Sequence, residues 1–230
     1  MAMSQHSPTD EQQGAQSRHS APTNEDEGVK QANTTTVTTA AHTELADRLQ
    51  AVSKRCVVID LETTGLDPHS DQIIEIALLR VRDRNVVDRF HTRVNPNSHI
   101  PAESTAIHGL TDAHVASAPF IEDVTRAVQG FLDDEVLVGH NVAFDMGFVE
   151  EAIAEGGLSW GGRPPRTLCT AKAARELIPR SRVGRYTLEN VARLAGSPVV
   201  PSHSADVDAL ATVDVLNWLA DEATLAVNRI

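Results

Sequence analysis

The chain has 230 residues, 41% of them hydrophobic, so it can bury one substantial core but is short for two ordinary domains. Its 32 aspartates and glutamates outnumber its 20 lysines and arginines, and the formal net charge of −12 excludes broad electrostatic adhesion to duplex DNA. The only two cysteines, Cys56 and Cys169, exclude a framework of several disulfides, and a reducing compartment is expected.

The N-terminal 43 residues are predicted to be a disordered polar tail. They are rich in Ser, Thr, Gln, Asn and Ala and nearly empty of large apolar residues, so burial cannot offset the entropy lost on ordering. They contain no apolar stretch of signal-peptide length, and the acidic run at residues 25–27 is atypical of a transit peptide. We therefore expect a cytoplasmic chain without membrane contact, whose folded domain spans residues 44–230.

The first half of the predicted domain consists mainly of strands. The β-branched run at residues 56–62 is typical of a central strand that ends in a turn at Thr64 and Gly65. Residues 72–81 and 86–94 are predicted to be two further strands, joined as a hairpin.

Helices and short strands alternate in the second half. Strands are predicted at residues 136–139 and 167–170, and helices at residues 121–132, 143–154, 171–177, 187–195 and 204–220. Helical periodicity also begins near Glu44, before the first strand. The expected fold class is α/β, with a mixed β-sheet flanked by α-helices.

Two acids stand at the end of the predicted central strand. Side chains alternate along a strand, so Asp60 and Glu62 project from one face while Ile59 and Leu61 serve the other. An Asp-x-Glu pair usually marks a solvated strand end. Here the preceding strand is too apolar for a wet edge, which favours a functional pair.

A third acid, Asp145, follows the short strand at residues 136–139 near the start of a helix, where negative charge is favoured. An ordinary acid in the first turn of a helix is the alternative interpretation. His203 precedes the last predicted helix, where an isolated histidine is usually a cap or a surface residue. At the mouth of an acidic cluster, an imidazole with a reference pKa of about 6.5 can accept a proton near neutral pH.

The last predicted helix contains two acids whose directions can be distinguished. At about 100° per residue, Asp208 lies on the apolar stripe with Ala205, Val215 and Leu219, whereas Asp206 lies on the polar side. An ionised carboxylate on a buried stripe is costly unless it is paired or bound to a metal. Asp208 is therefore the predicted metal ligand.

Three segments now form a recognisable set: residues 60–65 (DLETTG), 140–145 (HNVAFD) and 203–208 (HSADVD). They resemble the three exonuclease motifs of the DEDD superfamily, His variant, a DnaQ-like group that includes the proofreading epsilon subunit of bacterial replicative DNA polymerase. The resemblance runs in register over roughly residues 54–219, and residues 107–111 and 167–170 are similar to the intervening segments of that family.

The resemblance implies a ribonuclease H-like fold and hydrolysis of phosphodiester bonds with two metal ions. By that similarity Asp60, Glu62, Asp145 and Asp208 hold two Mg²⁺ or Mn²⁺ ions, and His203 is the general base. Carboxylate oxygens suit such hard cations, and a pair of ions about 3.5 to 4 Å apart stabilises both the entering and the departing oxygen.

The family likeness also implies a pocket for the terminal nucleotide, lined by Thr63, Leu66, His108, Asn141 and Phe144. Leu66 and Phe144 could press on the face of any base, although core packing is an equal alternative for Phe144. Downstream, a basic run is accompanied by the single acid Glu176; it comprises Arg166, Lys172, Arg175, Arg180, Arg182 and Arg185. Such a run usually forms a solvated face, and a track for phosphates is the competing interpretation.

The expected function is a 3′→5′ exonuclease that acts on single-stranded DNA and releases nucleoside 5′-monophosphates, in proofreading or DNA repair. A DNA polymerase subunit is a candidate partner. The first alternative is an exoribonuclease acting on short RNA or RNA ends, because the 2′-hydroxyl contacts that separate the two substrates are not visible in sequence. The second is a non-catalytic, polymerase-associated binding subunit, against which the complete set of acids and His203 argues.

Overall fold

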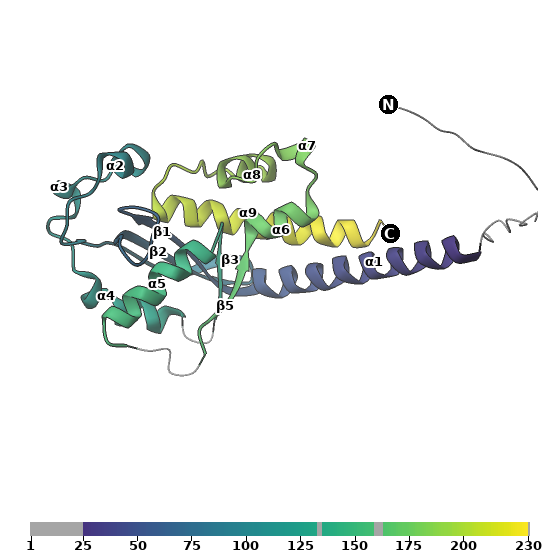
Figure 1. Ribbon diagram of the computed structural model, residues 1–230, viewed down its shortest axis with the longest axis horizontal. Helices are drawn as coiled ribbons and strands as arrows, with labels where there is room; N and C mark the ends of the chain where they lie inside the picture. Colours follow the sequence, from purple (N-terminus) through teal and green to yellow (C-terminus); the bar gives the residue numbers. More distant parts are fainter. Residues whose placement is uncertain (1–24, 133–134, 159–162, 230) are drawn as a thin grey trace, which may run out of the picture. The chain divides into compact units, whose positions relative to one another are not determined.

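The computed structural model describes residues 25–132, 135–158 and 163–229, with side chains from residue 40 onward (Figure 1). Its contacts divide the chain into two units, residues 1–38 and residues 39–230. Of the first unit only residues 25–38 are described, as helical backbone, and the packing and the sites below concern the second.

The first helix, α1 (Glu25–Lys54), begins earlier than predicted. Residues 25–43, expected to be part of a disordered tail, are helical backbone, whereas residues 1–24 lie outside the described residues. Helical hydrogen bonds form within the segment itself, so a scarcity of apolar side chains argues against packing and not against a helix. Packing starts further along, where Ala46, Leu49 and Val52 are buried at a spacing of three residues.

The sheet has five strands in the order β3-β2-β1-β4-β5. The central strand β1 (Arg55–Thr63) pairs antiparallel with β2 (Ile73–Arg82), which pairs antiparallel with β3 (Asn85–Arg93). On the other side β4 (Val136–Gly139) and β5 (Arg166–Cys169) run parallel to β1. The predicted mixed sheet and its hairpin are confirmed. The hairpin turns through Asp83 and Arg84, both at positive φ, which matches the twist of the paired strands.

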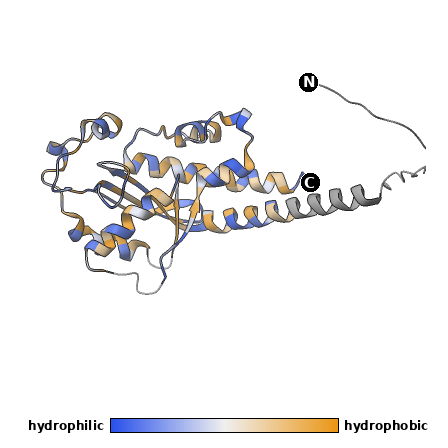
Figure 2. Cartoon of the chain, viewed as in Figure 1, coloured by the Kyte–Doolittle hydropathy of each residue, from blue (hydrophilic) through white to orange (hydrophobic). Residues whose placement is uncertain are grey.

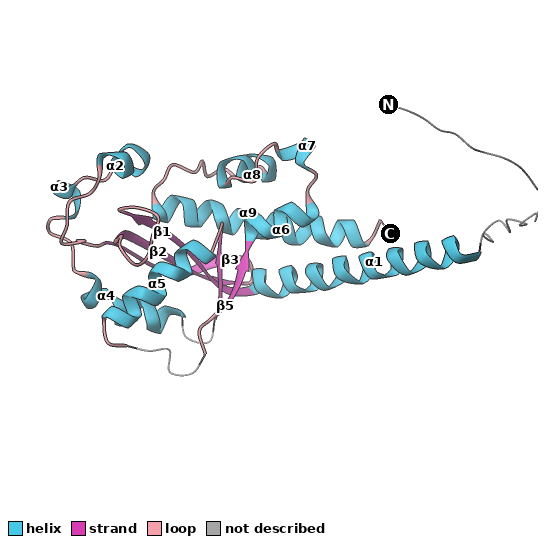
Figure 3. Ribbon diagram, in the orientation of Figure 1, coloured by secondary structure: helices cyan, strands magenta, loops and turns pink. Residues whose placement is uncertain are grey.

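Helices cover both faces of the sheet (Figure 3). They are α2 (Ala102–His108), α3 (Asp112–Val115), α4 (Ile121–Leu132), α5 (Ala143–Glu155), α6 (Thr170–Leu177), α7 (Arg180–Val183), α8 (Leu188–Ala195) and α9 (Ala205–Val227). The predicted helices within residues 121–220 are all present. The sequence did not predict α2, α3 and α7, because helices of four to seven residues are too short to show a periodic pattern.

Alternation along β1 separates two hydrophobic cores. Val57, Ile59 and Leu61 pack with α4 and α5, while Cys56 and Val58 pack with α1, α6, α8 and α9. Figure 1 shows α4 and α5 on one side of the sheet and α8 and α9 on the other, and Figure 2 shows hydrophobic and hydrophilic residues alternating along these helices. None of the helices in the described part of the chain combines the length and apolar character that crossing a membrane requires.

Candidate active site

Asp60 and Glu62 lie near the carboxyl end of β1, on the face that α9 covers. Their neighbours Ile59 and Leu61 belong to the core on the opposite face, as the alternation predicted. Glu62 is buried and lies opposite Glu75 of β2, and Asp60 is half-buried. Two carboxylates on one face of a buried strand therefore mark this end of the sheet.

Asp145 reaches the same place from the first turn of α5. The turn from β4 into α5 is tight: a Cβ at Gly139 would lie 3.1 Å from the Val142 Cβ and 3.3 Å from the Asp145 Oδ2. Asn141, within this turn, has a φ of 84°. Burial raises the pKa of Asp145 to about 7, against the opposing effect of hydrogen bonds from the backbone N–H groups of Asp145 and Leu61.

Asp208 comes from α9 and is buried, whereas Asp206 is half-buried and accepts a hydrogen bond from the Ser204 hydroxyl over 2.9 Å. The helical period therefore distinguished the two acids correctly. The Asp208 Oδ1 accepts a hydrogen bond of 2.8 Å from the backbone N–H of Ser202. Burial raises the pKa of Asp208, although this N–H and the nearby His203 act in the opposite direction.

The four carboxylates converge closely enough to repel one another. Burial, followed by repulsion from Asp145, Asp208 and Glu62, holds the pKa of Asp60 well above its usual range. Burial, with repulsion from Asp208, Glu75 and Asp145, raises the pKa of Glu62 to about 8. A cluster that resists full ionisation at neutral pH needs cations if all four groups are to be charged.

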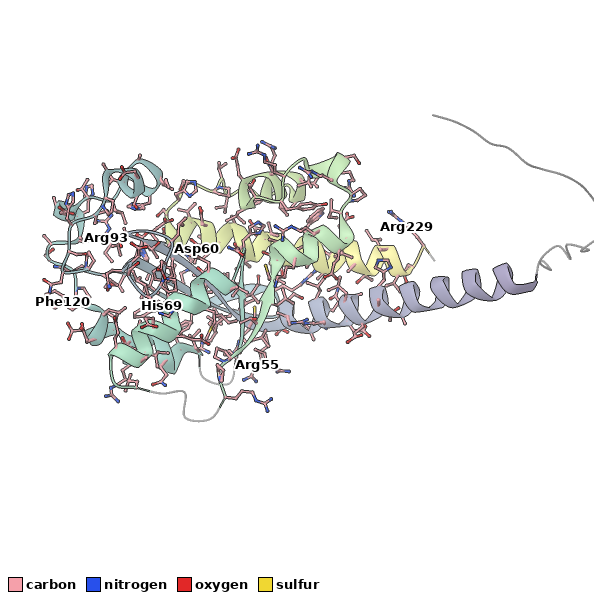
Figure 4. All side chains as sticks on the ribbon, in the orientation of Figure 1. Arg55, Asp60, His69, Arg93, Phe120 and Arg229 are labelled. Atoms are coloured by element: carbon pink, nitrogen blue, oxygen red, sulfur yellow. The ribbon has the colours of Figure 1, made fainter. Side chains whose placement is uncertain are left out.

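His203 completes the cluster. In the described part of the chain, a ring nitrogen of His203 and carboxylate oxygens of Glu62 and Asp208 all lie within 4.8 Å of one another, close enough to share one cation. Asp60, labelled in Figure 4 beside the first turns of α9, and Asp145 are not members of this group of three and join it through their electrostatic coupling. His203 is exposed and has a φ of 55°, a conformation that is uncommon outside glycine and tends to occur at functional sites.

The residues predicted to hold the terminal nucleotide differ in exposure. Leu66 is 84% exposed and Asn141 is exposed, so both are available to a ligand. Thr63 is buried, and its hydroxyl donates a hydrogen bond to the Gly65 carbonyl over 2.6 Å. Phe144 is half-buried and packs on Phe148 with 5.0 Å between ring centroids, so core packing accounts for at least part of its surface.

His108, at the end of α2, lies beside the acids. Its Nδ1 accepts a hydrogen bond from the Leu110 N–H over 3.0 Å, and its buried Nε2 has no hydrogen-bond partner among the described residues. Burial lowers its pKa from 6.5, while the charge of Glu75 acts in the opposite direction. Burial thus disfavours the protonated form of this imidazole beside Glu75.

Sequence reasoning missed Glu75, a buried acid of β2. One of its carboxylate oxygens accepts a hydrogen bond from the Ala205 N–H over 2.9 Å, and the other lies 3.0 Å from the His91 Nε2. Glu75 thereby ties β2 to the start of α9, two residues after His203. The signal that could have revealed it is an acid within the apolar run of residues 73–79, on the face of Glu62.

The chain is similar in sequence to known exonucleases. The family model described as RNase_T exonuclease matches residues 57–216. The DNA polymerase III subunit epsilon of Aquifex aeolicus is 32% identical over 168 residues, which cover 72% of this chain and 80% of that protein. A Mycobacterium tuberculosis protein whose name combines exonuclease and endonuclease is 37% identical over 182 residues, and the DNA polymerase III PolC-type of Thermotoga maritima is 37% identical over 160. The chain spans 28% and 11% of the length of these last two relatives.

Solved structures show the same similarity in three dimensions. One match is a structure of exonuclease X in complex with duplex DNA that has a 5′ overhang. The match covers 74% of this chain and 92% of the exonuclease X chain, with a TM-score of 0.55 and 29% sequence identity. The Escherichia coli exonuclease I structure with a dA16 oligonucleotide has a TM-score of 0.64 at 16% identity and shows a shared fold. The predicted ribonuclease H-like architecture is therefore confirmed.

Proposed function

The chain belongs to the RNase_T exonuclease family, and on this premise we propose that it is a metal-dependent 3′→5′ exonuclease that releases nucleoside 5′-monophosphates from single-stranded DNA. The observation that carries the proposal is the convergence of Asp60, Glu62, Asp145 and Asp208 beside the exposed imidazole of His203. Three distant segments of the chain contribute these groups. A non-catalytic binding subunit would have no use for four carboxylates that repel one another.

In this proposal the four acids hold two Mg²⁺ or Mn²⁺ ions, and oxygen-rich donors of this kind suit either cation. When bound, such ions polarise the scissile phosphate and stabilise the entering and departing oxygens. His203 accepts the proton of the attacking water, because its ring lies next to Glu62 and Asp208 yet is open to solvent. The hydrogen bond from Ser202 to Asp208 holds that carboxylate in place.

The terminal nucleotide is proposed to lie against Leu66 and Asn141, with Thr63, His108 and Phe144 completing its pocket. Leu66 exposes an apolar side chain that suits the face of any base. Asn141 is exposed on backbone at positive φ, four residues before Asp145. Residues 44–230 form the exonuclease domain in this proposal, with residues 1–43 outside it.

DNA is the proposed substrate because the relatives are named as DNA polymerase III components, and the exonuclease X and exonuclease I structures contain DNA. The similarity to the epsilon subunit and to PolC-type polymerases likewise favours proofreading or DNA repair, with a DNA polymerase subunit as the partner.

The test compares two acids of the same helix. Purified protein with Mn²⁺ is incubated with 5′-labelled single-stranded DNA and with RNA of the same sequence. Asp208→Asn should abolish shortening from the 3′ end, whereas Asp206→Asn, two residues away on the half-buried side, should retain it. Near-wild-type turnover by Asp208→Asn would refute the assignment. Faster shortening of RNA than of DNA would replace the proposed substrate with RNA.

A further inference from the structure

Two adjoining pockets lie along β5, the edge strand on the parallel side of the sheet. The first, of about 240 Å³, is lined by Asn141, Arg48 and Lys172 together with residues of β5. The second, of about 320 Å³, is lined by Arg48, Arg55 and Arg166. Because Arg48 lines both pockets, they adjoin at this residue, and we call the two together the β5 track.

The β5 track begins beside the candidate active site, at the carboxyl ends of the parallel strands, and ends at the amino ends of the same strands. Asn141 lies between β4 and α5, whose first turn carries Asp145. At the other end, Arg166 is the first residue of β5 and pairs with Val136 at the start of the parallel strand β4, while Arg55 is the first residue of β1. Four strand residues at about 3.3 Å each span about 13 Å, enough for more than one phosphate of an extended strand.

The charge of the β5 track is opposite to that of the whole chain. Arg48, Arg55, Arg166 and Lys172 are all exposed, in a protein whose formal net charge is −12. Arg48 donates a hydrogen bond of 2.8 Å to the Thr167 carbonyl, which holds it over the strand. Among the described residues, the side chains of Arg166 and Lys172 have no hydrogen-bond or ion-pair partner. Their charges are free to bind an anion.

The acids that line the β5 track do not cancel these charges. Glu135 is buried, and Arg80 and Arg82 bind its carboxylate, the former at 3.2 Å. Arg55 lies 3.4 Å from the same carboxylate but keeps 65% of its side chain exposed. Glu176, on α6, is the other lining acid and is exposed. The track therefore carries a net positive charge.

We propose that the β5 track binds the phosphates of the single strand upstream of the 3′ end that lies at the acids, through Arg48, Arg55, Arg166 and Lys172. The inference rests on the proposed function. No aromatic side chain among the described residues lines either pocket, so bases do not stack there. Binding is therefore independent of base sequence and depends strongly on salt.

The basic run noted in the sequence consists of residues with local contacts and residues that line the β5 track. Arg175 lies over the Tyr186 ring at 5.7 Å, Arg180 donates a hydrogen bond to the Gly184 carbonyl, and Arg182 pairs with Glu222 at 3.4 Å. These contacts are local to α6, α7 and α9. Two other members of the run, Arg166 and Lys172, are joined in the track by Arg48 and Arg55, which lie more than a hundred residues earlier in the chain.

The test measures binding of a labelled oligothymidylate of about 15 nucleotides by fluorescence anisotropy in EDTA, which separates binding from hydrolysis. Arg166→Ala combined with Lys172→Ala should weaken binding roughly 10-fold near 0.1 M salt and lower the slope of log K against log salt by about 1.4, at about 0.7 for each charge on single strands. With Mn²⁺, KM should rise while kcat stays the same. Arg89→Ala is the matched control, because it removes an exposed arginine from β3 at the other edge of the sheet. This variant should leave the affinity, the salt slope and KM unchanged.

Circular dichroism melting checks that the double variant folds, as expected for two exposed side chains. Arg166→Lys should preserve the salt slope, because it keeps the charge. An unchanged Kd and salt slope in the double variant, or an equal loss in Arg89→Ala, would overturn the track. If wild-type protein bound the strand through these residues but failed to shorten it, the proposed exonuclease function would be wrong and the proposed binding by the β5 track would be confirmed. If the double variant hydrolysed and bound the strand as the wild type does, the proposed binding by the β5 track would be wrong and the proposed exonuclease function would be supported.

Discussion

Carboxylates lie near both ends of β1, and the two ends differ in whether arginine side chains pair with them. Figure 4 shows Arg55 and Asp60 at opposite ends of this strand. At the amino end, the buried carboxylate of Glu135 is surrounded by Arg55, Arg80 and Arg82. At the carboxyl end, Asp60 and the three acids around it have no arginine or lysine partner among the described residues.

The difference separates a structural site from a functional one. An ionised group that leaves water must be compensated, and at the amino end the fold itself supplies the cations as guanidinium groups. At the carboxyl end the compensation is left to cations from solution, together with partial protonation of the acids. Unpaired acids in a well-packed sheet thus mark the place where the protein accepts an exchangeable partner.

After the loss of a carboxylate ligand, the largest effect is expected from the one proposed catalytic group that is not a carboxylate. His203→Ala should lower kcat at neutral pH by roughly 10²- to 10⁴-fold, the usual consequence of losing a general base. Because His203 is exposed, the melting temperature should hardly change. Measuring kcat from about pH 5 to about pH 9 tests the role of His203 as the general base. A variant whose pH–rate profile matches that of the wild type would remove His203 from proton transfer.

Opposite stability effects at the two ends of β1 would sharpen the comparison. Glu135→Gln leaves the half-buried guanidinium groups of Arg80 and Arg82 without their counter-charge and should lower the free energy of unfolding by about 3 kcal/mol, with activity per folded molecule retained. Asp60→Asn removes a repelling charge and should stabilise the metal-free protein while abolishing hydrolysis. Urea unfolding in EDTA measures both changes. Destabilisation of equal size in the two variants would break the comparison.

The smallest effect expected is on the pH dependence of stability. In the folded protein the pKa of Glu62 is raised to about 8 and that of Asp145 to about 7, so between about pH 4 and pH 8 the folded state binds more protons than the unfolded state. The metal-free protein should therefore lose stability as pH rises through this window. Mn²⁺ at a fixed concentration, about 100 times its Kd near pH 8, should restore about 2.7 kcal/mol there and less at lower pH, because protons compete for the carboxylates.

Melting temperatures near pH 5 and near pH 8, each with and without Mn²⁺, provide the measurement. Asp60→Asn is the matched control, because with one carboxylate fewer the pH dependence should weaken. Stability of the metal-free protein that rises with pH would show that the acids do not repel one another as the structure indicates.

Much of the fold and of the candidate site could be predicted wherever a local pattern fixes a direction. Alternation placed Asp60 and Glu62 on the face opposite Ile59 and Leu61, and the helical period distinguished Asp208 from Asp206. The bounds of α4 and β4 agree with the prediction for the same reason. The segments without such a pattern were predicted less well: the short helices were missed, and the start of α1 was placed too late.

The sequence by itself determined which residues could carry the chemistry, because side-chain direction within a strand or helix depends only on neighbours a few positions away. The tertiary structure decided which of them meet. The contact of Glu75 with Ala205 joins residues 130 positions apart, and the hydrogen bond of Arg48 to Thr167 joins residues 119 apart. Such contacts follow from the order of strands in the sheet and from the helices packed on it, which no local pattern contains.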